Sequence, residues 1–171
     1  MSYNYLKSNV PNVIKEAYSL LGISEVLGKD HNPVILKWAD EVGLKNIYTA
    51  DEIPWCGLFV AYVCKKAKKE IVKNPLWARN WAKFGTKENE ALLGDILVFS
   101  RGSGGHVGFY VGEDKKCYHV LGGNQGDKVS VVRIVKSRCI AIRRAEWKYF
   151  QPLSVRKILL DDKGAISKNE A

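Results

Sequence analysis

The sequence predicts an α+β fold, with N-terminal helices packed on a small antiparallel sheet or open barrel of about five to six strands. Three observations predict it. Apolar residues recur at helical spacing in the part of the chain before Gly94. After Gly94 they alternate at period two, and β-branched residues become frequent. The chain has 171 residues and 46% hydrophobic content, which suits one compact domain with a real core.

The helices are expected in the first part of the chain. Apolar residues at helical spacing predict a helix over 11–21. A second helix is expected over 33–42, because Asn32 is a good N-cap and proline stands at the first helical position. A third helix is expected over 56–69, with its apolar side chains on one face and its lysines largely elsewhere. A short helix is predicted over 76–84.

The strands follow Gly94 and are joined by short turns, which is typical of an antiparallel sheet. We expect them at 95–100, 106–112, 116–121, 128–135 and 139–144.

The domain boundary is placed near the end of the last predicted strand. Residues 1–150 form the single catalytic domain of this prediction. Residues 151–171 form a C-terminal extension, which we expect to be partly flexible because small and polar residues dominate it from Lys163 onward.

Composition narrows the functional classes. The formal net charge of +9 implies attraction to anionic polymers. The lysines are spread without a recognisable reading helix or aromatic RNA platform, so no nucleic-acid partner is expected. There is no secretory signal at the N-terminus and no run of about 18 apolar residues, so we expect a protein made in the cytoplasm without a membrane span. The four cysteines lack disulfide or zinc spacing, so free thiols, no metal and no cofactor are expected. We also expect the protein to be a monomer.

Cys56 and His106 are the candidate nucleophile and base. Cys56 stands at the predicted start of a helix, where the helix dipole and unpaired N–H groups lower a thiol pKa and can bind an oxyanion. His106 follows a run of glycines and opens an alternating strand, which would let a substrate backbone approach closely. On this reasoning alone, the first interpretation of Cys56 is a small core residue at the end of an apolar stripe, and the glycine-rich entry to the strand of His106 is a weak signal.

Four sequence blocks in this order resemble the NlpC/P60 and CHAP group of papain-like peptidases and amidases, particularly phage-borne members. The resemblance covers residues 10–145 and implies a papain-like fold with Cys56 as nucleophile and His106 as base. Helix-borne cysteine before strand-borne histidine also separates this group from circularly permuted acyltransferases and favours hydrolysis. The blocks are PWCGLFV at 54–60, GDILVF at 94–99, GHVGFYVG at 105–112 and LGGNQ at 121–125.

The third residue must accept the second ring N–H of His106, and the register of the following hairpin decides which residue does so. If Glu113 and Asp114 form a two-residue turn, His119 falls on the same face as His106. A histidine follows the catalytic one at a similar distance in NlpC/P60 enzymes. If the turn is one residue longer, Asn124 becomes the orienting residue, as in papain and CHAP enzymes. We favour His119 and keep Asn124 as the alternative.

The oxyanion hole is expected to use the backbone N–H of Cys56 and a second donor from upstream. Papain-like proteases place a glutamine six positions before the cysteine, where this chain has Ala50, and NlpC/P60 enzymes place a tyrosine somewhat further upstream than Tyr48. Tyr48 lies close to the tyrosine position of NlpC/P60 enzymes but departs from it, and it is our candidate for the second donor. Trp55 and Gln125 are further candidates for oxyanion or substrate binding.

The resemblance implies hydrolysis of an amide bond in peptidoglycan, by an endopeptidase or an N-acetylmuramoyl-L-alanine amidase, with no cofactor. The lack of a signal sequence fits a phage endolysin that stays in the host cytoplasm until it is released to the wall. The basic surface would help it to bind anionic envelope polymers. Two alternatives are an interbacterial toxin amidase with the same chemistry and a non-enzymatic wall- or nucleic-acid-binding module in which Cys56 is only core.

Overall fold

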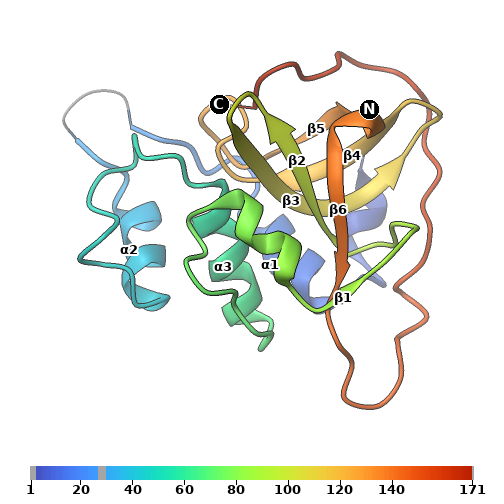
Figure 1. Cartoon of the computed structure of the whole chain (residues 1–171), viewed down its shortest axis with the longest axis horizontal. Coiled ribbons are helices and arrows are strands. Elements are labelled where there is room, and N and C mark those ends of the chain that lie inside the picture. The colour runs from blue at the N-terminus through green and yellow to red at the C-terminus, as the bar shows by residue number, and fades with distance from the viewer. Residues whose placement is uncertain (1–2, 27–29, 171) are drawn as a thin grey trace.

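The computed structural model describes residues 3–26 and 30–170 of the chain. Its helices lie on one side of a single antiparallel sheet of six strands (Figure 1). The predicted α+β class, with helices first and strands after, is confirmed. None of the helices in the described ranges is long and apolar enough to cross a membrane.

The helices begin close to the predicted positions and end earlier. Asn32 caps the second helix as predicted, since its side-chain oxygen accepts a hydrogen bond from the Val34 N–H at 2.8 Å. The predicted short helix is a 3₁₀ helix. The helical segments are η1 (Asn4–Lys7), α1 (Asn12–Ser19), α2 (Pro33–Glu41), α3 (Cys56–Lys66), η2 (Ala78–Lys83) and η3 (Lys136–Arg138).

The sheet has the strand order β1-β6-β2-β3-β4-β5, and every neighbouring pair is antiparallel. Five strands match the predicted ones, and the two-residue edge strand β1 was not predicted because it is too short to show a period. The strands are β1 (Thr86–Lys87), β2 (Ile96–Arg101), β3 (Gly104–Glu113), β4 (Cys117–Gly122), β5 (Ser130–Val135) and β6 (Cys139–Arg144).

The main core lies between the sheet and the helices, with α3 in contact with β3 at its centre. A second, smaller cluster fills the other face of the curved sheet, where Phe99, Tyr110 and Val120 are buried. Side chains alternate along a strand, so Val107 and Phe109 point toward the helices while His106 and Tyr110 lie on the opposite face. His106 therefore lies on the face of the sheet away from the main helical core.

The hairpin of β3 and β4 contains a β-bulge. Tyr110 pairs with Val120, whereas Gly112 pairs with His119, so the register shifts by one residue between them. The turn itself is two residues later than predicted. The Asp114 N–H donates to the Cys117 carbonyl, and the loop consists of the two lysines between them.

The C-terminal segment runs back along the sheet (Figure 1). Leu159 forms a bridge with Glu113 on β3, and Ile166 forms a bridge with Arg133 on β5. Near its end, the Glu170 carboxylate is buried and accepts two hydrogen bonds from Arg138, at 2.8 and 2.7 Å. This segment therefore adds buried contacts to the sheet well beyond its last strand.

Candidate active site

Cys56 is the first residue of α3 and is only 3% exposed. Backbone N–H groups in the first turn of a helix have no partner within the helix, so they are free to bind a negatively charged atom. Burial raises the pKa of the Cys56 thiol, while hydrogen bonds from the N–H groups of Val107, Gly57 and Cys56 itself oppose that rise. In the resting protein the thiol is therefore neutral and surrounded by donors that favour a thiolate.

The position of β4 explains why the Val107 N–H is free for the thiol. Tyr110 exchanges backbone hydrogen bonds with the β2 side of the sheet, so Val107, three residues earlier, directs its N–H toward the β4 side. Strand β4 ends at Gly122 and leaves this N–H without a strand partner. The start of α3 occupies the space next to it. Cys56 therefore lies beside the backbone of the residue that follows His106.

His106 lies near the start of β3, is fully buried, and has one side-chain hydrogen bond. Its Nε2 atom is 2.9 Å from Oε1 of Gln125. The amide group of Gln125 is oriented by its own donors, because Nε2 of Gln125 donates to the Ser130 carbonyl at 2.6 Å and to the Val120 carbonyl at 3.3 Å. The amide oxygen must therefore face the imidazole, and His106 must donate its Nε2–H to it.

This hydrogen bond leaves Nδ1 of His106 as the unprotonated nitrogen of the neutral ring. Nδ1 is buried and has no hydrogen-bond partner among the described residues. Buried polar atoms without partners are rare, and a catalytic role is one of the explanations for them. Nδ1 thus belongs to the strand residue directly before Val107, whose N–H contacts the Cys56 thiol, and its lone pair is available to accept a proton.

The electrostatic surroundings keep His106 neutral. Burial lowers its pKa to about 4, although the negative charge of Glu170 and the hydrogen bond to Gln125 favour the protonated ring. Arg101 and Arg138 add positive charge nearby and favour the neutral ring. A neutral base with an available lone pair is therefore the dominant form over most of the pH range in which enzymes work.

The structure contradicts the predicted contact between His119 and His106. Nε2 of His119 is 3.0 Å from Oδ2 of Asp114, and its Nδ1 is 2.8 Å from the hydroxyl of Tyr3. Both ring nitrogens are therefore occupied by other partners. The physical reason is the β-bulge in the hairpin, which places His119 opposite Gly112 and on the other face of the sheet.

Asn124 is not the orienting residue either. Its side-chain amide donates to Glu25 at 3.1 Å, and the same carboxylate oxygen of Glu25 accepts a hydrogen bond from the indole of Trp55 at 2.6 Å. The residue before Cys56 and the residue before Gln125 are thus held by one carboxylate. Trp55 is fully buried and faces the core, so it does not line a groove as a candidate substrate-binding side chain would.

Tyr48 does not present its hydroxyl to the thiol in this structure. The side chain is buried, and its O–H donates to the carbonyl of Ile53 at 3.1 Å. The second donor of an oxyanion hole is therefore better sought among the backbone N–H groups at the start of α3.

The rim of the site is formed by the segment 75–79. An added Cβ at Gly57 would meet the carbonyl oxygens of Pro75 and Leu76, and one at Gly105 would meet Arg79 at 3.0 Å. This segment therefore contacts both the residue after Cys56 and the residue before His106. Trp77 lies in the middle of it and is 72% exposed.

Sequence reasoning missed the position of Gln125 relative to His106, although it named Gln125 as a binding residue. One local signal was available. An aspartate directly before a two-residue loop often accepts hydrogen bonds from the loop N–H groups, and Asp114 accepts those of Lys116 and Cys117. Placing the turn there would have excluded His119 and moved attention to the loop after β4. Glu25 and Glu170 gave no sequence signal.

No group of three or more histidine, cysteine or acidic side chains in the described ranges is arranged to hold a metal ion. No protein-family model matches the chain, and no curated protein matches it.

Proposed function

We propose that this chain is a cysteine-nucleophile hydrolase with a papain-like fold that cuts an amide bond in bacterial peptidoglycan. The observation that carries the proposal is the orientation of His106. Gln125 takes its Nε2–H and leaves a buried, unpartnered Nδ1. The Val107 N–H, one residue along the strand, hydrogen-bonds the thiol of Cys56 at the start of α3.

The proposed mechanism follows from these positions. The thiol of Cys56 gives its proton to Nδ1 of His106 as the sulfur attacks the carbonyl carbon of the substrate amide. The oxyanion of the tetrahedral intermediate binds the free N–H groups at the start of α3. Protonated His106 then gives its proton to the leaving amine, which leaves a thioester on Cys56. Water hydrolyses the thioester, with His106 again acting as base.

Gln125 has a positioning role in this mechanism. Its amide oxygen holds the ring in the tautomer with the proton on Nε2, and it stabilises the imidazolium ion that forms during attack. Its own amide protons are bound to backbone carbonyls, so the oxygen cannot rotate away without breaking two hydrogen bonds.

Peptidoglycan as the substrate rests on the resemblance of the four sequence blocks and on two surface features. The net charge of +9 suits approach to an anionic envelope. Trp77 exposes its ring on a segment that contacts both halves of the site, where it could stack on a sugar or a flat peptide group. We extend the proposal to an endolysin-type enzyme that is held in the host cytoplasm until its release to the wall.

The test is mass spectrometry of the fragments released from purified sacculi. Wild-type protein should release new muropeptides with a free amine at one position, which also identifies the bond. Cys56→Ala should release none. Cys64→Ala removes the same group from a fully buried cysteine on the same helix and is the matched control. Release of the same fragments by folded Cys56→Ala, or none by the wild type, would refute the proposal.

A further inference from the structure

An exposed apolar loop of 148–153 stands out on the surface away from the site. Its side chains Tyr149, Phe150 and Leu153 are 84, 83 and 96% exposed. Large apolar side chains gathered in one short loop are unusual on a soluble protein surface and mark a place where something binds. None of the three contributes to the core clusters of the described residues.

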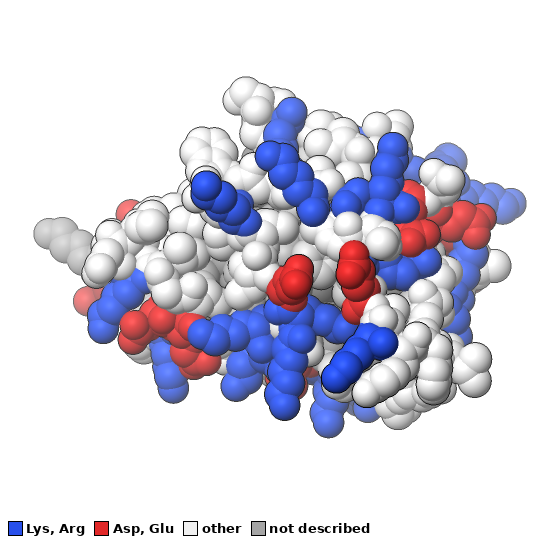
Figure 2. All heavy atoms as spheres, turned by 60° about the horizontal axis from the view of Figure 1, so that its bottom comes forward, with Lys and Arg blue, Asp and Glu red and all other residues white. Residues whose placement is uncertain are grey.

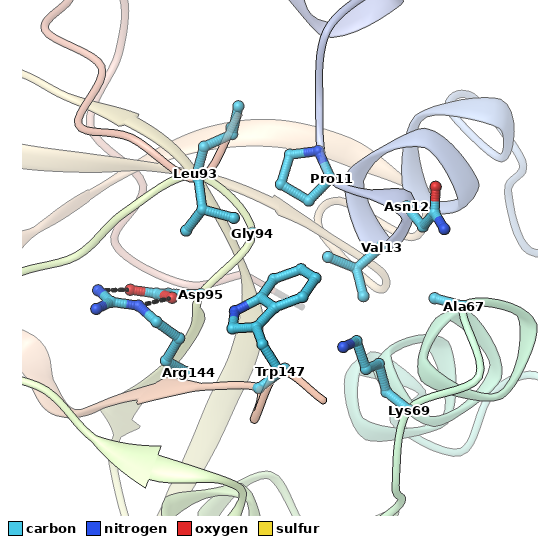
Figure 3. Close-up of a pocket in the computed structure, with 12 residues that line it drawn as sticks. Pro11, Asn12, Val13, Ala67, Lys69, Leu93, Gly94, Asp95, Arg144 and Trp147 are labelled. Carbon is cyan, nitrogen blue, oxygen red and sulfur yellow. Dashed lines mark hydrogen bonds and ion pairs between the residues drawn. The ribbon is translucent and has the colours of Figure 1, made fainter. Parts of the chain in front are cut away.

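Both ends of the loop pack against the body of the domain. Trp147 packs into a hollow lined by Pro11, Val13 and Lys69, and the Lys69 ammonium lies 3.9 Å from the centre of its ring (Figure 3). Val155, at the other end of the loop, is buried and lines the same hollow. The loop is therefore held by packing contacts at its two ends, while its apolar tip between them is exposed.

Lysines lie beside the base of the loop. Four of them line one hollow beside the segment 145–148, together with only two glutamates, and lysine and arginine are more prominent than acidic residues on the face shown in Figure 2. None of these four lysines forms an ion pair with a carboxylate within the described ranges. The lysines are Lys68, Lys69, Lys83 and Lys148, and the glutamates are Glu70 and Glu146.

We propose that the 148–153 loop inserts its apolar tip into an anionic phospholipid bilayer surface, while the lysines at its base bind the lipid phosphates. The apolar tip of the loop would enter the acyl-chain layer of such a surface. The lysines beside its base would then lie at the level of the charged headgroups. A soluble anionic polymer would use the lysines and leave the apolar tip in water. The inference is independent of the proposed hydrolytic function.

The experiment is flotation of the full chain with lipid vesicles. We expect it to bind vesicles of phosphatidylglycerol and phosphatidylcholine in equal parts, and not vesicles of phosphatidylcholine alone. Replacing Tyr149, Phe150 and Leu153 together by serine should weaken binding by at least about tenfold, since burying each of these groups contributes to the affinity. Cys56→Ala should bind like the wild type.

The matched control removes an equal number of exposed apolar side chains elsewhere, with Val34, Ile47 and Leu159 replaced by serine. It should bind vesicles like the wild type. In a separate variant, replacing Lys68, Lys83 and Lys148 by glutamine should cost about fivefold per lysine at low salt. Melting temperatures check that each variant is folded.

Three results would overturn the inference. The first is absence of wild-type binding to the anionic vesicles. The second is a triple serine loop variant that binds them as tightly as the wild type, which would leave only a basic surface for soluble polymers. The third is a dimer in solution that the same loop variant dissolves, which would make a second copy of the chain the occupant of the loop. As a positive readout, Phe150→Trp should add a blue-shifted emission component with anionic vesicles.

Discussion

His106 has two ring nitrogens, and one hydrogen bond to Gln125 decides which of them is free. Glutamine reaches the ring from the loop after β4, and its amide group is fixed in turn by the backbone carbonyls of Val120 and Ser130. Backbone carbonyls therefore orient the amide, and the amide orients the imidazole. Each step fixes the orientation of the next without any charged group in direct contact with the ring.

Replacement of Gln125 tests this order. Gln125→Ala should lower kcat for wall hydrolysis by about 10²- to 10⁴-fold, because the ring loses its fixed tautomer, while KM changes little. Gln125→Glu places a carboxylate against the ring and should raise the pKa of His106, so that the acid limb of the pH profile moves to higher pH. Initial rates of turbidity loss on permeabilised cells measure both effects. An alanine variant with wild-type kcat would exclude a positioning role.

His119 should behave in the opposite way. Its ring is buried between Asp114 and Tyr3, so His119→Ala leaves the Tyr3 hydroxyl without this partner and removes one of the hydrogen bonds that Asp114 accepts, which should cost about 1–3 kcal/mol of stability. The kcat of the folded variant should stay within a few-fold of the wild type. Urea unfolding and the same lysis assay separate the two quantities. A large loss of kcat at unchanged stability would contradict this prediction and would indicate that His119 takes part in the reaction.

At the scale of elements, α3 carries Cys56 and β3 carries His106, and the segment 75–79 contacts both elements. Gly57 permits this, because an added Cβ would lie 2.8 Å from the carbonyl oxygen of Leu76 and still closer to that of Pro75. Backbone atoms cannot move aside as a flexible side chain can. Position 57, directly after Cys56, therefore has space for the hydrogen of glycine but not for a Cβ atom.

Gly57→Ala should consequently destabilise the protein by about 1–3 kcal/mol and lower activity, because the strain is relieved only by moving the start of α3 or the rim. Gly104→Ala is the matched control, since an added Cβ there would meet only the Arg101 carbonyl at an ordinary 3.6 Å. Thermal unfolding and lysis rates provide the comparison. Equal behaviour of the two variants would show that the rim is not held as described.

The sequence predicted the positions of Cys56 and His106 because each lies at the start of an element, and such starts are marked by local features. A helical apolar stripe begins at Cys56, and an alternating strand follows the glycines before His106. The partner of His106 depends on a turn position, a β-bulge and a loop conformation together. Those features are set by contacts between distant residues, which periodicity does not report.

On the scale of the whole molecule, buried ion pairs connect the strands with the turns and with the C-terminal segment. Asp114 accepts hydrogen bonds from Arg133 and His119, while Asp95 pairs with Arg144 and Glu170 with Arg138. Burial would raise the pKa of Asp114, but the N–H groups of the turn and these two side chains lower it to about 2. The sheet thus depends on carboxylates that stay ionised and on a His106 that stays neutral.

Stability should therefore fall in mild acid. The pKa of His106 is lowered by burial to about 4, whereas a histidine in the unfolded chain titrates near pH 6.5. Below about pH 6.5 the unfolded chain takes up a proton that the folded chain does not, so stability is lost progressively toward about pH 4. His119, whose pKa burial also lowers, acts in the same direction. Asp114 adds its loss only below about pH 3.8.

Thermal unfolding at a series of pH values measures this loss. The melting temperature of the wild type should decrease between about pH 6.5 and pH 4, and His106→Asn should decrease less over the same range because one of the two protons is removed. The variant also tests the assignment to His106. Identical slopes for the two proteins would mean that His106 is protonated equally in the folded and unfolded chains.

The β-bulge between Tyr110 and Gly112 has a consequence for how such hairpins diversify. On one side of the bulge, Tyr110 shares a face with His106 and pairs with Val120. On the other side, Gly112 pairs with His119. A single extra residue in β3 is thus enough to turn His119 to the face of the sheet opposite to that of His106. Equal spacing between two histidines in a hairpin is therefore no guarantee that they share a face of the sheet. The parity of the residues between them is the quantity to compare.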